Sequence, residues 1–322
     1  MRNYIFMISL ALILQYPAVC GGSDIIPVDR IQVIQDQIDG SEVGDTVFVS
    51  PGHYSGLREY RNRFGLTVWV AIVMRSGVSV VGVTGKPEDV VIDCGGEGYG
   101  ILFESVDGST RLSGISVQNA SWAVSGESSS PKIMNCFFEN NGDTIRTPNC
   151  AGTGMYFDRS SLVVTDCVFR GNIAGSGAGA CFSMGSIVLL ERCHFIGNLA
   201  RRHGGGIVVG YESQLTLEGC IIESNSAKLN GGGIYCSGQS LKVTGGSIVG
   251  NSAGQQGGGC DLVFLNKPAE FSQVTILENC GQLGSQGIDI PIREIKLVCC
   301  ETDTTGWEGW FAFESEGCSN GN

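Results

Sequence analysis

The sequence predicts an all-β solenoid, in which short parallel strands stack as successive coils around one apolar core. Three observations predict it: a motif that returns every 26 to 28 residues, strand-like runs separated only by turn residues, and no 10-residue amphipathic helix between those runs. The units of such a repeat protein bury their apolar faces only by stacking on their neighbours. The fold class is therefore the parallel β-helix.

The repeat is clearest between Leu162 and Glu294. Each copy begins with a short apolar run, has an asparagine five residues later, and reaches a cluster of small residues six residues after that asparagine. Asn, Gly and Ser tolerate tight or left-handed turns, so three short strands and their turns fill one period. The copies start at Cys167, Cys193, Cys220, Gly246 and Val274, and their asparagines are Asn172, Asn198, Asn225, Asn251 and Asn279.

Equivalent positions of successive copies predict rows of inward side chains. The asparagines predict a further row, whose stacked amides satisfy buried backbone groups at one turn. The first inward row is Cys136, Cys167, Cys193, Cys220, Gly246 and Val274, and the second is Phe138, Phe169, Phe195, Ile222, Ile248 and Ile276. The third is Met155, Cys181, Ile207, Ile234, Cys260 and Ile288.

Residues 1–20 are predicted to be a signal peptide, because Arg2, the apolar run Ile5–Leu14 and the small-residue site before Gly21 follow that pattern. A lipid attached to Cys20 is the alternative. Either reading predicts an exported protein in the periplasm, at the cell surface or outside the cell. No later segment is long and apolar enough to cross a membrane, so we expect none in the mature chain.

The solenoid is expected to span residues 21–298, with clear repeats at 107–294. Residues 27–40 predict a short helix, with Asp29 as N-cap and Ile31, Ile34 and Ile38 on one face, that covers the open end of the coils. The strand at 44–49 and the turn that contains His53 follow.

The loop between Asn141 and Gly152, which includes Asp143, Arg146, Pro148 and Cys150, is five residues longer than its later equivalents. Residues 299–322, with Trp307 and Trp310, predict a C-terminal cap in which one disulfide among Cys299, Cys300 and Cys318 is plausible.

Composition excludes some classes of partner. A net charge of −12 argues against binding to nucleic acid or to anionic membranes. It also argues against binding to polyanions such as pectate without the help of a cation. The 14 cysteines of an exported chain would ordinarily indicate a disulfide scaffold, but four of them share one inward row, where Cys acts as a small hydrophobe. No zinc-ligand spacing and no cofactor motif is present.

The Phe169-Arg-Gly-Asn172 and Phe195-Ile-Gly-Asn198 elements, with the Gly-Gly-x-Ile elements that follow, resemble two groups of repeats. One is the right-handed parallel β-helix, or pectin-lyase-like, superfamily; the other is the repeats of bacterial polymorphic outer-membrane proteins. The resemblance implies a right-handed coil and leaves the function open among lyases, hydrolases, epimerases, adhesins and binding proteins. The paired Asp and Arg-Ile-Lys motifs of polygalacturonases are absent, and no compact group of carboxylates plus arginine, as in pectate lyases, is apparent.

Two outward features are candidate sites. Alternation along a strand predicts that the residue after each member of the third inward row faces out, which gives Tyr156, Phe182, Val208, Tyr235, Asp261 and Asp289. Such a row suits stacking on sugar rings, and Asp261 with Asp289 would be a carboxylate pair for glycosidase chemistry or for calcium. The turn Arg201-Arg202-His203 would hold a carboxylate or sulfate of a glycan. Each feature also has a non-functional explanation. The outward row would be a strand face half-covered by loops, and the two acids and the Arg201-Arg202-His203 turn would be solvated charges without a role.

Three functions therefore stay open. The first is an exported carbohydrate-binding or structural module of the cell envelope, whose partner is an extracellular polysaccharide or cell-surface glycan. The second is a polysaccharide lyase or glycoside hydrolase that uses the weak catalytic candidates Asp261 and Asp289. The third is a surface adhesin.

Overall fold

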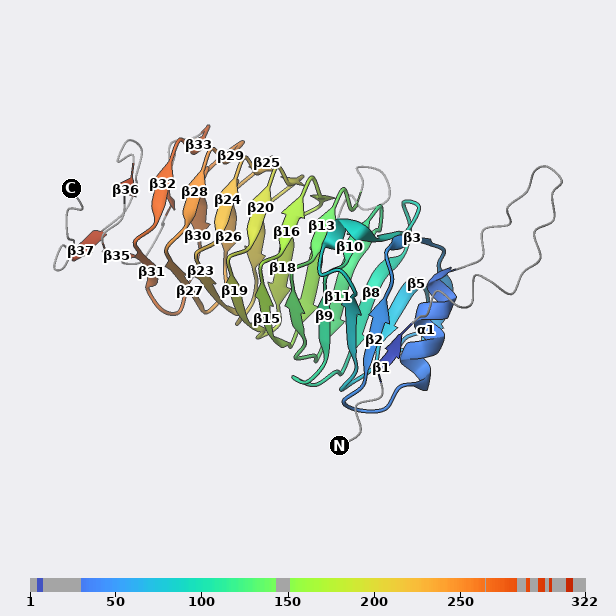
Figure 1. The fold of residues 1–322 in the computed structure, drawn as a ribbon. Coiled ribbons are helices and arrows are strands. Elements are labelled where there is room, and N and C mark those ends of the chain that lie inside the picture. Colours follow the sequence, from blue (N-terminus) through green and yellow to red (C-terminus); the bar gives the residue numbers. More distant parts are fainter. Residues whose placement is uncertain are drawn as a thin grey trace, which may run out of the picture.

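The computed structural model describes residues 5–7, 30–142, 151–263 and 265–282, and the strands at 288–289, 295–298, 301–302 and 311–314. Its strands lie side by side along one axis, and the helix α1 (Arg30–Gly40) lies across one end (Figure 1). Within the described residues every strand pairing is parallel except that of β4 with β5. The chain is the parallel β-solenoid that the repeat predicts.

Each regular coil crosses three long sheets and one short sheet in turn. Sheet A contains β1 (Ile5–Met7), β2 (Thr46–Val49), β6 (Ser79–Gly82), β9 (Arg111–Ser113), β12 (Lys132–Met134), β15 (Ser161–Thr165), β19 (Ile187–Glu191), β23 (Gln214–Glu218), β27 (Ser240–Thr244), β31 (Ala269–Ser272), β35 (Ile295–Val298) and β37 (Phe311–Glu314). Sheet B contains β3 (Gly52–Ser55), β7 (Val90–Asp93), β10 (Ser116–Gln118), β13 (Phe137–Glu139), β16 (Val168–Arg170), β20 (His194–Ile196), β24 (Ile221–Glu223), β28 (Ser247–Val249), β32 (Thr275–Leu277) and β36 (Glu301–Thr302).

Sheet C bears the outward face on which the candidate sites lie. It contains β4 (Arg58–Arg61), β5 (Thr67–Met74), β8 (Tyr99–Glu104), β11 (Trp122–Glu127), β14 (Met155–Asp158), β18 (Ala180–Ser183), β22 (Ile207–Val209), β26 (Ile234–Cys236), β30 (Cys260–Leu262) and β34 (Ile288–Asp289). The short sheet contains β17 (Ile173–Ala174), β21 (Leu199–Ala200), β25 (Ser226–Ala227), β29 (Ser252–Ala253) and β33 (Cys280–Gly281), and a 3₁₀ turn, η2 (Pro87–Asp89), precedes β7.

The first two inward rows are confirmed. Every member is buried except Gly246, which has no side chain. The phenyl rings of Phe169 and Phe195 stack with centroids 4.4 Å apart. The ladder thiols donate to backbone carbonyls of their own coil and of the preceding one, as Cys193 does to Glu191 and Val164. Burial raises the pKa of the Cys167 thiol well above its usual value. Cys136, Cys167, Cys193 and Cys220 are all free thiols that are buried in the core.

The prediction for the third inward row is wrong at one coil. Ala180, rather than Cys181, pairs with Met155 and with Ile207, so Phe182 points into the core and is completely buried. The cause is a turn that is one residue shorter, because β18 begins eight residues after Asn172 whereas β22 begins nine residues after its own asparagine. A shift of one residue moves every side chain of a strand to the opposite face.

The predicted asparagine row is confirmed, and it extends back to Asn141. The Oδ1 of Asn198 accepts the backbone N–H and the side-chain amide of Asn172, at 3.1 and 3.0 Å. Its Nδ2 donates to the Phe169 carbonyl at 2.9 Å and to the Asn225 Oδ1 at 2.8 Å. Each buried amide thus joins neighbouring coils at one corner of the solenoid.

The predicted cap is also confirmed, since Ile31, Ile34 and Ile38 of α1 are buried against the first coil. Gln35 of this helix is buried as well. Its amide accepts the backbone N–H of Val73 and donates to the Val73 carbonyl, which satisfies the backbone of β5 at the end of the sheet. Across the described parts of the chain, no helix combines the length and apolarity needed to span a bilayer.

Several predictions fall outside the described residues: Asp29 as N-cap, most of the signal peptide, the loop side chains from Asp143 to Cys150, and the cysteines and tryptophans of the tail. β1, within the predicted signal peptide, pairs with β2. β36 and β37, within the predicted C-terminal cap, each extend a sheet by one strand. The signal peptide, the limits of the domains and the tail disulfide stay predictions.

We predict that Asn198→Ala strongly destabilises the fold. The change leaves the Phe169 carbonyl, two donors of Asn172 and the Asn225 Oδ1 without this partner, and each buried unsatisfied group costs about 1–3 kcal/mol. Urea unfolding should therefore show a loss of about 3 kcal/mol or more. Leu199→Ala, the next residue in the chain and partly exposed, is the control and should change stability little. Equal losses in both variants would contradict the ladder argument.

Candidate functional site

A groove of about 300 Å³ lies on the outward face of sheet C, near the capped end. The antiparallel hairpin β4–β5 contributes Asn62, Phe64 and Val68 to its lining, and three strands, β8, β11 and β14, contribute the remaining residues. Those residues are Tyr99, Leu102, Phe103, Glu104, Ser125, Gly126, Glu127, Tyr156 and Asp158, together with Arg159 just after β14. The groove therefore combines aromatic, acidic and basic side chains.

Three carboxylates, Glu104, Glu127 and Asp158, form an acidic row along one side of the groove. The strand register pairs each with the next, so they lie on successive rungs, about 4.8 Å apart along the solenoid. Each is the last residue of its strand. The residue after it has a positive φ in every case, +56° at Ser105, +49° at Ser128 and +47° at Arg159. This left-handed turn ends the strand at the same point in each coil.

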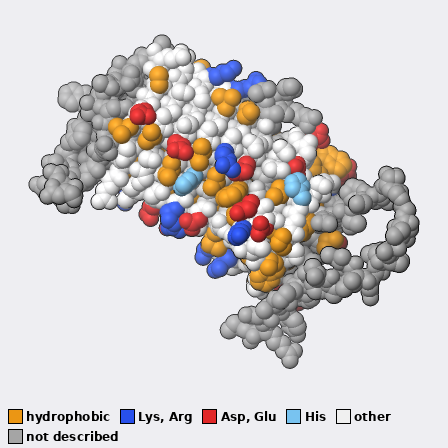
Figure 2. All heavy atoms as spheres, turned by 45° about the horizontal axis from the view of Figure 1, so that its top comes forward, with side chains coloured by type: hydrophobic (Ala, Val, Ile, Leu, Met, Phe, Trp, Pro, Cys, Tyr) orange, Lys and Arg blue, Asp and Glu red, His pale blue; other side chains and the backbone are white. Residues whose placement is uncertain are grey.

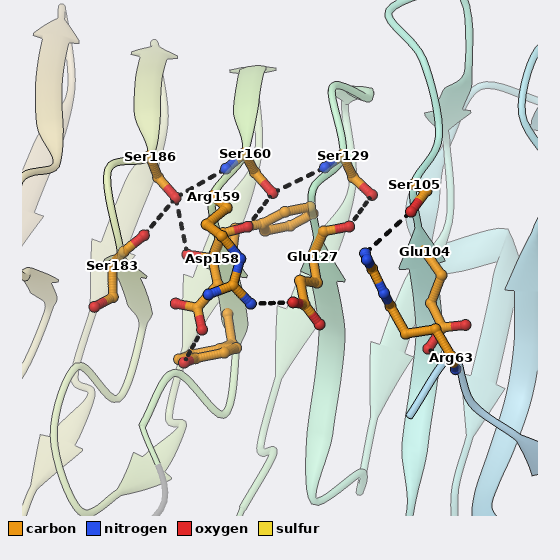
Figure 3. Close-up of polar contacts among 12 residues, drawn as sticks. Arg63, Glu104, Ser105, Glu127, Ser129, Asp158, Arg159, Ser160, Ser183 and Ser186 are labelled. Atoms are coloured by element: carbon orange, nitrogen blue, oxygen red, sulfur yellow. Dashed lines mark hydrogen bonds and ion pairs between the residues drawn. The ribbon is translucent and has the colours of Figure 1, made fainter. Parts of the chain in front are cut away.

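A row of buried serines fixes these turns (Figure 3). The hydroxyl of Ser160 donates to the Asp158 carbonyl at 2.6 Å and accepts the backbone N–H of Ser129 at 3.1 Å. The hydroxyl of Ser186 accepts the backbone N–H of Ser160 in the same way, at 3.2 Å. This serine ladder, which the sequence analysis missed, holds the backbone beneath the acidic row.

Each member of the acidic row has a different partner. Glu104 accepts the Tyr60 hydroxyl at 3.0 Å and the backbone N–H of Arg63 at 3.4 Å, so the hairpin is tied to the row. Burial is the main cause that raises the pKa of Tyr60, and the hydrogen bond from its hydroxyl to Glu104 adds to the effect. Glu127 forms an ion pair with Arg159, whose guanidinium reaches back to the preceding coil (Figure 3).

Asp158 keeps one oxygen without a partner. Its Oδ2 accepts the Tyr156 hydroxyl at 2.8 Å, whereas its Oδ1 is buried and has no hydrogen bond in the described part of the chain. Burial, and then the contact with Asp158, raises the pKa of Tyr156 well above its usual value, so this phenol stays a donor. A buried carboxylate oxygen with no partner is costly, and a donor group of a ligand would satisfy it.

An aromatic pair lies at the start of β8 and β11, at the opposite end of these strands from Glu104 and Glu127. Tyr99 lines the groove, and its ring stacks on that of Trp122 with centroids 4.9 Å apart and planes 11° apart. The Trp122 indole N–H donates to the Ala151 carbonyl at 3.2 Å, which fixes the pair. The groove therefore has a ring for stacking at one end of β8 and carboxylate acceptors at the other.

The acidic row is not arranged as a metal site. In the ranges that the structure describes, no group of three His, Cys, Asp or Glu residues is placed to hold an ion. Glu127 is already paired with Arg159, and Glu104 accepts two protein donors. The chemistry that this geometry offers is acceptance of hydrogen bonds, with a carboxylate pair at Glu127 and Asp158 available for acid–base work.

A family model described as the right handed beta helix region matches residues 99–280, more than half of the chain. The chain belongs to this family. The handedness implied by the sequence resemblance is thereby confirmed for the β-helix. These findings do not test the resemblance to repeats of polymorphic outer-membrane proteins, which stays a prediction. No curated protein matches the chain.

Three solved structures similar to this β-helix are about equally distant from it. The Azotobacter vinelandii mannuronan C-5 epimerase AlgE4 A-module is 12% identical, with 90% of this chain and 94% of that chain covered and a TM-score of 0.32. The catalytic unit of a GH87 α-1,3-glucanase from Streptomyces thermodiastaticus is 12% identical, with 90% and 64% covered and a TM-score of 0.29. The Agl-KA catalytic domain is 12% identical, with 91% and 66% covered and a TM-score of 0.33. The family assignment rests on the family model alone.

The residues proposed from the sequence fall in two places on the β-helix. Tyr156 belongs to the groove, whereas Tyr235 lies three rungs further along the same outward row. His203 lies 4.6 Å from the Tyr235 ring, centroid to centroid, and its Nδ1 is buried without a hydrogen bond within the described chain. Burial, and then the charge of Arg202, lowers the pKa of His203. Arg201 shares this turn, and Arg202 is exposed.

Two predictions on the outward row need correction. Phe182 lies in the core and its place in the outward row is taken by Cys181, because of the shorter turn described above. Asp261 faces outward by register, next to Tyr235, but only 1% of it is exposed, so it is not the solvated acid that the sequence suggests. Its strand pairs with Asp289 in the expected register, but the side chain of Asp289 lies outside the described residues.

The acidic row was missed because it precedes the stretch in which the repeat is clearest, Leu162 to Glu294. Glu104, Glu127 and Asp158 are separated by 23 and 31 residues, and the second interval includes the long loop. The sequence analysis considered only a calcium-binding group of the pectate-lyase kind, and this row is not one, because no three of the described His, Cys, Asp or Glu residues are placed to hold an ion. A signal was present: Phe103-Glu-Ser, Gly126-Glu-Ser-Ser and Phe157-Asp-Arg-Ser all place an acid directly before a turn that contains serine.

We predict that Tyr156→Phe reduces the sensitivity of the protein to alkali. A phenol whose pKa is raised by folding contributes stability that is complete below the unfolded pKa of about 10 and is lost as pH rises toward the folded value. Above about pH 10, the free energy of unfolding of the wild type should therefore fall more steeply than that of the variant. Urea unfolding at a series of pH values measures both slopes, and equal slopes would contradict the assignment.

Proposed function

We propose that the protein binds an extended, neutral glycan in the groove on sheet C. Two observations carry the proposal: Tyr99, stacked on Trp122, lines the groove at the start of β8, and the acidic row lines it at the ends of β8, β11 and β14, where the Asp158 Oδ1 lacks a hydrogen bond within the described chain. Sugar rings present an apolar face to aromatics and hydroxyl donors to carboxylates. Neighbouring rungs repeat these groups along the solenoid axis, as an extended chain of sugars requires.

Charge supports a neutral glycan over a uronic acid polymer. Three carboxylates and one guanidinium line the groove, and the whole chain carries a net charge of −12. Figure 2 shows one face of the molecule, on which basic side chains are interspersed with acidic and apolar ones. A polyanion would meet repulsion at the acidic row. The signal-peptide pattern of residues 1–20 supports a location outside the cytoplasm, where such polymers are met.

Binding of neutral oligosaccharides is the test, measured by glycan array and then by calorimetry. Tyr99→Ala should weaken binding by about 1–3 kcal/mol, the scale known for bases stacked on aromatics, and leave the fold intact. Asp158→Asn should also weaken it, because an amide replaces one of the two carboxyl oxygens that accept hydrogen bonds. Tyr235→Ala is the matched control, since it removes an outward tyrosine three rungs away.

The result that would contradict the groove is loss of binding in Tyr235→Ala with none in Tyr99→Ala. The glycan would then lie on the face formed by Tyr235 and the Arg201–His203 turn, as proposed from the sequence. If no glycan binds at all, the carbohydrate proposal fails and the adhesive or structural alternative is left.

A second candidate function, glycoside hydrolysis, is favoured by one observation. Glu127 and Asp158 lie on adjacent rungs, and a carboxylate separation of about 5–5.5 Å is typical of retaining glycosidases. Glu127 would attack the anomeric carbon as the bond to the departing oxygen breaks, and Asp158, in its protonated form, would give that oxygen its proton. A water molecule, deprotonated by Asp158, would then displace Glu127 and complete hydrolysis. Arg159 would balance the charge of Glu127.

Glu127→Gln and Asp158→Asn should then each abolish release of reducing sugar. A reducing-sugar assay with the neutral glycans that bind checks this outcome, and Glu139→Gln on sheet B is a control that should retain turnover. Binding without turnover in the wild type would rule out hydrolysis and leave the binding module.

A further inference from the structure

A second cavity, of about 390 Å³, shares the β4–β5 hairpin with the groove. Val68 lines the groove, whereas Trp69, the next residue of β5, lines this second cavity. Successive residues of a strand point to opposite faces, so the two cavities use different faces of the hairpin. The other lining residues are Ser55, Gly56, Leu57, Asp93, Cys94, Gly95 and Glu97.

The lining of this cavity is acidic, and it contains no lysine or arginine among the described residues. Asp93 accepts hydrogen bonds from the Gly95 N–H at 3.0 Å, the Gln118 amide at 2.9 Å and the Asn119 amide at 3.0 and 3.1 Å. Burial raises the pKa of Asp93, but these donors outweigh it and hold the pKa below its usual value. All three donors are neutral amides, so they hold the carboxylate ionised and do not cancel its charge.

The acidic row of the groove differs, because its central carboxylate has a cationic partner. Glu127 is paired with Arg159, which carries a full positive charge. In the described part of the chain, Asp93 makes no ion pair with lysine or arginine. The imidazole of His53 lies 3.5 Å from the Gln118 amide and also lowers the pKa of Asp93 through its charge. A fixed, ionised carboxylate without a lysine or arginine partner favours a cation from solution.

Trp69 determines which kind of cation fits. Half of this residue is exposed, whereas a tryptophan is ordinarily largely buried. The face of an indole attracts organic ammonium groups, and recognition of such groups commonly combines aromatic rings with carboxylates. A small hydrated metal ion would gain little from Trp69 and Leu57.

We propose that this cavity binds an organic ammonium group, with Trp69 against the cation and with Asp93 and Glu97 supplying negative charge. The site is separate from the groove and does not depend on the glycan proposal. A primary amine and a quaternary ammonium share this chemistry, so the experiment tests one probe of each kind.

Choline and ethanolamine are the charged probes, and 3,3-dimethylbutan-1-ol is the matched neutral control, because it has the shape of choline without its charge. Binding is measured by calorimetric titration at pH 8. We expect saturable binding of at least one charged probe in the millimolar range, and binding of the neutral analogue at least about tenfold weaker. Tighter binding of choline indicates a quaternary ligand, and tighter binding of ethanolamine indicates a primary amine.

Variants locate the site. Trp69→Leu should weaken binding of the charged probe about two- to fivefold, the scale of an exposed cation–π contact, whereas Trp69→Phe should retain part of it. Asp93→Asn and Glu97→Gln should each weaken it as well, with thermal unfolding as the check on the fold. Tyr211→Leu and Glu212→Gln are the matched controls, since they change an exposed aromatic and its acidic neighbour elsewhere.

Three results would overturn the proposal: no saturable binding of either charged probe, equal binding of the neutral analogue, or binding that survives Trp69→Leu and Asp93→Asn unchanged in folded protein. Tyr99→Ala should not affect the ammonium probes. Loss of glycan binding in that variant with ammonium binding intact therefore separates the two sites, and failure of one proposal leaves the other standing.

Discussion

The stacking of each coil on the next, held by one buried asparagine per coil, is the constraint on which the rest of the structure depends. The Asn198 amide bonds the coil before it and the coil after it, so no coil can slide without breaking several buried hydrogen bonds. The serine row does the same at the turn beneath the acidic row. Because both ladders fix the register, side chains far apart in the sequence, such as Glu104 and Asp158, lie in one line.

The parts of the fold that could be predicted are those that repeat. The inward cysteine and phenylalanine rows and the asparagine ladder follow from a period near 26 residues, and the capping helix follows from three isoleucines on one face. The error at Phe182 has the same origin, since a fixed period was extended across a turn that is one residue shorter. Periodicity locates a strand, but only the hydrogen-bonded register decides which face each residue takes.

The groove could not be predicted from the repeat, because it lies where the repeat is irregular. One of its walls is an antiparallel hairpin with no counterpart in later coils. The loop after Asn141 lengthens the interval between Glu127 and Asp158, so the acids do not recur at the period of the repeat. Tyr156 was the only proposed site residue that the structure places there. Tyr235 and His203 do contact each other, as their positions in the sequence suggested, but they lie three rungs further along the solenoid.

The β4–β5 hairpin has a consequence for how such proteins diversify. β4 pairs only with β5, at the edge of sheet C, so its sequence is not tied to the coil-by-coil stacking that constrains the core. Residues of this one excursion reach two cavities, through Val68 and through Trp69. Exchange of residues 58–69 would therefore alter two recognition surfaces in a single genetic step, while the buried part of β5, which pairs with β8, stays the same.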